Sequence, residues 1–160
     1  MYRAAARQAG ALWCQDFTEM IDMLVGLAHI GVPGSRRVGV VSGPGAAGVV
    51  TADACEEQGL PFAKLSEDTV GKLRTILPPF GSPHNPVDLT AAIFEDMDLY
   101  TKATAVMMQD PDVDLMFILG PSEIDPVLFS ERVVASAPAW PKPRLVAWIA
   151  SDHAFGLGAG

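Results

Sequence analysis

The stretch VGVVSGPGAAG, from Val38 to Gly48, decides the fold. It reads as a short apolar strand, a tight glycine turn and the first turn of a helix. That order directs several backbone N–H groups, together with the positive end of a helix dipole, at one point in space. The natural ligand of such a point is an anion, most often a phosphate. We therefore expect phosphate-binding groups at Ser42, Gly43, Gly45, Ala46, Ala47 and Gly48.

Strands and helices alternate along the rest of the chain. Hydrophobic periodicity and end signals predict an α/β domain with a parallel, doubly wound sheet. The expected strands are 37–41, 60–65, 113–119 and 145–149, with shorter ones at 11–14 and at the end of the loop 80–90. The expected helices are 2–8, 17–30, 46–58, 67–77, 94–109 and 126–135.

These elements predict helices over residues 1–34, ahead of one domain over residues 35–160. The chain stops just after a strand, where such a fold needs another covering helix. We therefore expect the domain to be truncated at its C-terminus.

Composition narrows the class of protein. The chain has 160 residues, of which 49% are hydrophobic and 19% charged, as is typical of a globular domain. Its formal net charge is −8, and its largest basic cluster is Arg36–Arg37, which argues against nucleic-acid binding. Cys14 and Cys55 are expected to be buried thiols in a reducing compartment. The sequence has neither a signal-peptide pattern nor an apolar run near the ~18 residues of a membrane span, so we expect a cytoplasmic protein without membrane contact.

Three interpretations of the glycine turn stay open at this point. Pro44 lacks an N–H, which removes one donor from a phosphate site. Gly43, Gly45 and Gly48 also satisfy G-x-G-x-x-G between a strand and a helix, which is the dinucleotide pattern. An acidic residue for the ribose is missing roughly twenty residues on, where Lys64 would instead suit the 2′-phosphate of NADP. The third interpretation is a structural turn with nothing bound.

Longer phrases of the chain carry a family resemblance. They are TADACEEQGL (Thr51–Leu60), LSEDTVGKLRTILPPFGSPHNPVDLT (Leu65–Thr90) and DPDVDLMFIL (Asp110–Leu119). With these phrases the chain resembles the succinyl-CoA-ligase-like, flavodoxin-like domain of NDP-forming acyl-CoA synthetases. The opening YRAAARQAGALWCQDFTEMIDML is similar to the connector before that domain. The resemblance covers almost the whole chain, and LPPF followed by NPVDLT is its most specific part.

The resemblance implies a flavodoxin-like, three-layer fold and a part in a ligase. The reaction joins a carboxylate to CoA and releases NDP and phosphate. The parent enzyme would use ATP or GTP with Mg, and CoA. A phosphohistidine carries the phosphoryl group in this family, and helices after glycine turns point their N-termini at it. The partners would be a CoA-binding domain and an ATP-grasp domain, in cis or as subunits. The chain alone is expected to be inactive, with neither a catalytic residue nor a metal site of its own.

Other motif residues have weaker signals. Asn85 precedes a proline and Asp88 can accept from loop N–H groups, so a structural role competes with ligand contact at both. His84 is expected to serve the loop. His153 is only faintly similar to the family's carrier loop, which lies upstream of this domain. An alternative parent is a synthetase-like protein acyltransferase in which this domain is non-catalytic.

Overall fold

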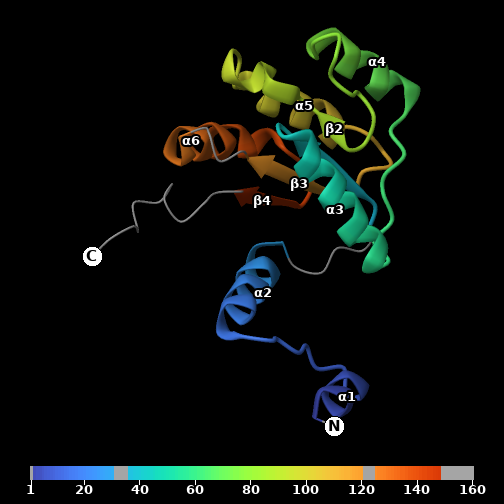
Figure 1. Ribbon diagram of the computed structural model, residues 1–160, viewed down its shortest axis with the longest axis vertical. Helices are drawn as coiled ribbons and strands as arrows, with labels where there is room; N and C mark the ends of the chain where they lie inside the picture. Colours follow the sequence, from blue (N-terminus) through green and yellow to red (C-terminus); the bar gives the residue numbers. More distant parts are fainter. Residues whose placement is uncertain (1, 31–35, 121–124, 149–160) are drawn as a thin grey trace. The chain divides into compact units, whose positions relative to one another are not determined.

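The computed structural model describes residues 2–30, 36–120 and 125–148, and the chain divides into two compact units, residues 1–32 and 33–160. The first unit contains α1 (Tyr2–Gln8) and α2 (Phe17–Ile30) (Figure 1). Asp16 accepts the Glu19 N–H at 2.8 Å, and the Glu19 carboxylate accepts from the Gln15 N–H, so the N-terminus of α2 is capped. The strand predicted at 11–14 is wrong. The described part of this unit is otherwise helical and offers that segment no strand partner.

A parallel four-stranded sheet organises the second unit (Figure 1). Its strand order, β2-β1-β3-β4, follows the start of a flavodoxin-like sheet, and it confirms the predicted α/β fold. The strands are β1 (Val38–Ser42), β2 (Val87–Asp88), β3 (Leu115–Gly120) and β4 (Arg144–Trp148). The α-helices are α3 (Gly45–Glu57), α4 (Glu67–Ile76), α5 (Asp98–Met108) and α6 (Pro126–Ser136), with 3-10 turns η1 (Thr90–Phe94) and η2 (Ala137–Ala139).

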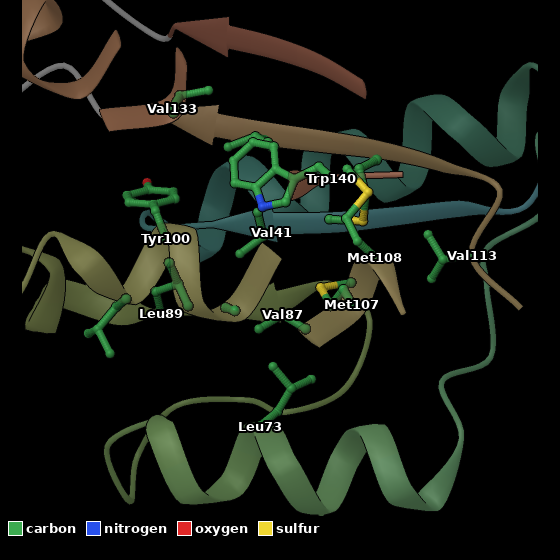
Figure 2. Packing of buried hydrophobic residues seen from close by; sticks show 14 of the residues in the cluster. Val41, Leu73, Val87, Leu89, Tyr100, Met107, Met108, Val113, Val133 and Trp140 are labelled. Carbon is green, nitrogen blue, oxygen red and sulfur yellow. The ribbon is translucent and has the colours of Figure 1, made fainter. Parts of the chain in front are cut away.

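Two apolar clusters cover the two faces of the sheet. The smaller one joins Val38 and Val40 of β1 to Cys55 of α3. The larger one lies on the opposite face, where Val41 and residues of β3 pack against α4, α5 and α6 (Figure 2). Side chains of β1 alternate between the clusters because successive residues of a strand point to opposite faces. All of β1 is buried, so its carboxyl end is held firmly where α3 begins.

The outer edge of β1 differs from the prediction. Residues 60–65 do not form a strand, and a single bridge links them to β1. In it the Val38 N–H donates to the Pro61 carbonyl at 2.8 Å and the Ala63 N–H donates to the Val38 carbonyl at 2.9 Å. The side chain of Asn85 takes the neighbouring positions. Its Oδ1 accepts from the Val40 N–H at 2.8 Å, and its Nδ2 donates to the carbonyls of Val38 and Ala63 at 2.7 and 3.0 Å. One amide therefore replaces the ladder that a longer strand would have made.

The helix predicted at 94–109 begins four residues later than predicted. The chain forms η1 first, and α5 begins only at Asp98, where the Asp96 carboxylate accepts the Asp98 N–H at 2.9 Å. Tyr100, Thr104, Met107 and Met108 point inward as predicted, whereas Met97 is half-buried.

The predicted start of α4, start of α6 and end of α3 are confirmed. Ser66 accepts the Thr69 N–H at the start of α4, Asp125 accepts the Val127 N–H at the start of α6, and Gly59 follows α3 with a φ of +66°. The other predicted strands and helices of this unit agree with the structure to within two residues.

Candidate functional site

The glycine turn lies at the carboxyl edge of the sheet, where ligands bind in open α/β folds. Helix α3 begins at Gly45, and Pro44 occupies the N-cap position with φ −77° and ψ 115°. Proline has no side-chain acceptor, so no side chain caps this helix. A helix without a cap presents its first N–H groups to whatever lies beyond them.

Three of the expected donors are already used inside the protein. The Gly43 N–H donates to the Tyr100 hydroxyl at 2.8 Å, and the Ala47 N–H donates to the Pro44 carbonyl at 3.0 Å. The Ser42 hydroxyl also donates to that carbonyl, at 2.6 Å. These bonds fix the shape of the turn.

Two backbone donors are left for a ligand. Among the described residues, no hydrogen-bond partner is found for the N–H groups of Gly45 and Ala46. Ala46 is exposed and Gly45 is half-buried, so both can be reached from solvent. Gly48 is buried one turn further along, and a Cβ there would lie 3.2 Å from Cβ of Pro86. This close approach packs α3 on the loop before β2, and the phosphate contact expected of Gly48 stays a prediction.

Tyr100 closes the crevice between β1 and β3. The chain leaves β1 for one edge of the sheet and later returns to form β3, so this crevice is the topological switch point where ligands usually bind. The Tyr100 hydroxyl accepts from Gly43 and donates to the Leu119 carbonyl at 2.8 Å, and its side chain is 1% exposed. The open space at the carboxyl edge lies instead on the other side, between β1 and β2.

Asp88 is the charged group nearest to the start of α3. It pairs with Ser42 in the parallel register of β1 and β2, and its Oδ2 lies only 2.6 Å from where a Cβ of Gly45 would stand. Its Oδ1 accepts the N–H of Thr90, a residue with a φ of +59°. The structure thus joins Asp88 to the glycine turn, although Asp88 and Gly45 lie more than forty residues apart in the sequence. The sequence pattern could have indicated this proximity, because Ser42 and Asp88 both lie at the carboxyl ends of strands, and the carboxyl ends of neighbouring parallel strands share one edge of a sheet.

Two pockets flank Asp88 and Gly45. One has a volume of about 380 Å³ and extends over η1, and the other, of about 200 Å³, lies against α3 and the loop before β2. The larger pocket is lined by Gly43, Pro44, Gly45, Asp88, Thr90, Ala91, Ile93 and Phe94. The smaller one is lined by Ser42, Gly45, Gly48, Val49, Ser82, Pro86, Val87 and Asp88.

The remaining candidate residues lie elsewhere. Asn85 is engaged with backbone groups, as described above. Lys64 and His84 line a third pocket that contains no residue of the glycine turn, so the pairing of Lys64 with that turn, which NADP would require, is not seen. His153 lies outside the described residues.

Within residues 2–30, 36–120 and 125–148, no three His, Cys, Asp or Glu side chains are arranged to hold a metal ion. None of the described helices has the length and apolar character needed to cross a bilayer.

Comparison with known proteins gives a consistent family. The model of the Ligase-CoA domain matches residues 38–142. The alpha subunit of the ADP-forming acetate–CoA ligase II of Pyrococcus furiosus is 36% identical over 120 residues, covering 74% of this chain and 25% of that protein. The ADP-forming acetate–CoA ligase I of Archaeoglobus fulgidus is 30% identical over 135 residues, covering 83% of this chain and 19% of that protein.

Solved structures agree in fold. The dinucleotide forming acetyl-coenzyme A synthetase 1 of Ca. Korarchaeum cryptofilum, solved in complex with phosphate and ADP, has a TM-score of 0.80 and 25% sequence identity. That match covers 97% of this chain but 34% of the solved one, so the chain spans about a third or less of the length of these relatives. The family match, the sequence identities and the shared sheet lead to one conclusion. This chain belongs to the Ligase-CoA domain family, whose relatives include ADP-forming acetate–CoA ligases.

Proposed function

We propose that this chain is a domain of an ADP-forming acyl-CoA synthetase, and that the N-terminus of α3 stabilises a phosphoryl group carried on a histidine of another domain. The reaction would convert a carboxylate, CoA and ATP or GTP, with Mg, into an acyl-CoA, the nucleoside diphosphate and phosphate. A CoA-binding domain and an ATP-grasp domain would supply the remaining parts. The names of the relatives support the reaction class.

One observation carries the local part of the proposal: the free N–H groups of Gly45 and Ala46 at the start of a 13-residue helix. Gly45 lines the open pocket at the carboxyl edge, and Ala46 follows it in the first turn of α3. The helix dipole stabilises an anion by about 0.3–1 kcal/mol at an exposed helix end and by up to about 2 kcal/mol when partly buried, and charge-assisted bonds from the backbone N–H groups add to this. This is enough to favour a phosphoryl group that is held in place by other means.

Asp88 argues against capture of free phosphate from solution. Its carboxylate stands beside Gly45, and the chain as a whole carries a formal charge of −8. A dianion approaching α3 is therefore repelled both at long range and at the site. Delivery of the phosphoryl group by an attached domain agrees with this electrostatic arrangement better than diffusion does.

The test removes one donor and leaves the helix in place. Ala46→Pro deletes the N–H in the first turn, where helices tolerate proline, and Ala46→Gly keeps the N–H as the matched control. In the assembled synthetase, we expect Ala46→Pro to lower the amount of histidine-bound phosphate formed from labelled ATP by about tenfold, and Ala46→Gly to change it less than about twofold, because one charge-assisted bond contributes about 1.5–3 kcal/mol. Equal labelling in both variants would contradict a phosphoryl-stabilising role for α3.

A further inference from the structure

A separate pocket lies beside the outer edge of β1, and its volume of about 680 Å³ is typical of small-molecule sites. We call it the edge pocket. Segment 62–65, one face of α4 and the residues His84 and Asn85 line it. None of the glycine-turn residues belongs to it, so an inference about this pocket is independent of the proposed function.

Basic side chains gather at the edge pocket of an acidic chain. Lys64, Arg74 and His84 line it, with Glu67 as the only carboxylate among the lining residues. Within the described ranges, neither Lys64 nor Arg74 has an acidic group at ion-pair distance. Four other described cations, Arg37, Lys72, Lys102 and Arg132, each pair with an aspartate. The charges at the edge pocket are therefore available to a ligand.

The pocket also has an apolar wall. Phe62 and Val70 lie among its lining residues, and Val70 and Arg74 stand one turn apart on α4, so an apolar surface and a guanidinium share one face of that helix. A guanidinium fork suits a phosphate, and an ammonium group adds a second charge. We propose that the edge pocket binds an organic phosphate, with the phosphate group at Lys64 and Arg74 and a planar ring against the apolar wall. Nucleotides are the chemical class that combines these two parts.

AMP is the probe that tests this. In an NMR titration of the 160-residue chain, AMP should shift the amide signals of 62–65 and of α4 and saturate, and adenosine and inorganic phosphate should each bind at least about tenfold more weakly, since each lacks one of the two contacts. Lys64→Gln and Arg74→Gln should each weaken AMP binding by about tenfold. Their side chains are exposed, so we expect the melting temperature to stay unchanged.

Lys72→Gln is the matched control. Lys72 is on the same helix, is paired with Asp68 and does not line the pocket. It should leave AMP affinity within about twofold. The proposal is overturned if AMP does not saturate, if Lys72→Gln weakens binding as much as Arg74→Gln, or if AMP shifts only the signals of Gly45 and Ala46. A failure here leaves the Ala46→Pro experiment unaffected, because the two experiments share no residue.

Discussion

Replacing Asp88 by Asn tests the effect of the negative charge beside the N-terminus of α3, because it removes that charge and little else. Asparagine keeps an Oδ1 acceptor for the Thr90 N–H, so the local hydrogen bond can persist while the negative charge is removed. Because Oδ2 of Asp88 lies within 2.6 Å of the ideal Cβ position of Gly45, the perturbation acts directly at the two free N–H groups. We expect Asp88→Asn to strengthen the binding of inorganic phosphate at this site.

The size of the effect follows from Coulomb's law. An anion bound to the N–H groups of Gly45 and Ala46 would lie roughly 5 Å from the Asp88 carboxylate, given ordinary hydrogen-bond lengths. At about 5 Å, two unit charges repel by roughly 0.8 kcal/mol in water and by about 3 kcal/mol at the effective dielectric of a protein surface. Asp88 is half-exposed, so the lower part of this range applies. An energy of about 1–1.4 kcal/mol corresponds to a five- to tenfold gain in affinity.

The assay is an NMR phosphate titration that follows the amide signals of Gly45 and Ala46 in both proteins. Asp53→Asn is the control, because it removes the same charge from an exposed position further along α3. It should change the affinity by less than about twofold, since solvent and salt screen that distance. The reasoning is refuted if Asp88→Asn binds phosphate no better than the unmodified chain, or if Asp53→Asn gives an equal gain.

Three further substitutions test the scaffold around the site by chemical denaturation. Tyr100→Phe removes the hydroxyl that bridges Gly43 and β3, and should lower the free energy of unfolding by about 1–3 kcal/mol, because two buried backbone groups lose their partner. Asn85→Asp sets a carboxylate against the backbone carbonyls of Val38 and Ala63, and should cost about 2–4 kcal/mol, more than Asn85→Ala; an equal cost would contradict the donor role of Nδ2. At Asp110, burial acts to raise the pKa of the carboxyl group. Hydrogen bonds from Thr69, Ser66 and the Asp112 N–H outweigh burial and hold that pKa below its usual value. That stabilisation is complete above the unfolded pKa of about 3.9 and is lost as the pH falls through the lower folded pKa, so Asp110→Asn should flatten the acid side of the stability profile.

The sequence was most informative where the structure is local. Cap residues such as Ser66, Asp125 and Gly59 act through neighbours within a few positions, so their pattern predicted the ends of three helices. The all-buried strand β1 and the small-residue helix α3 followed in the same way from short-range hydrophobic patterns.

Long-range contacts explain what could not be predicted. Residues 60–65 have the apolar pattern of a strand, but the Asn85 side chain, more than twenty positions away, takes the hydrogen bonds they would need. Tyr100 was placed in the core by its periodicity, yet nothing local indicates that its hydroxyl holds Gly43. The meeting of Asp88 with Gly45 likewise depends on the register of β2 on β1. Each of these features decides the shape or charge of the candidate site.

The backbone holds Asp88 on both sides. Its own N–H donates to the Ser82 carbonyl at 3.1 Å, and the following Leu89 N–H donates to the Ser42 carbonyl at 2.9 Å. The Thr90 N–H also holds Oδ1 of the carboxylate at 2.8 Å, which favours a charge that stays beside Gly45 and repels free phosphate. A covalently tethered phosphoryl group would reach the same spot at an effective concentration on the order of millimolar, which makes a weak site sufficient. Under the proposed role, Asp88 would thus allow α3 to bind a phosphoryl group attached to another domain. It would also prevent free phosphate from occupying the site between turnovers.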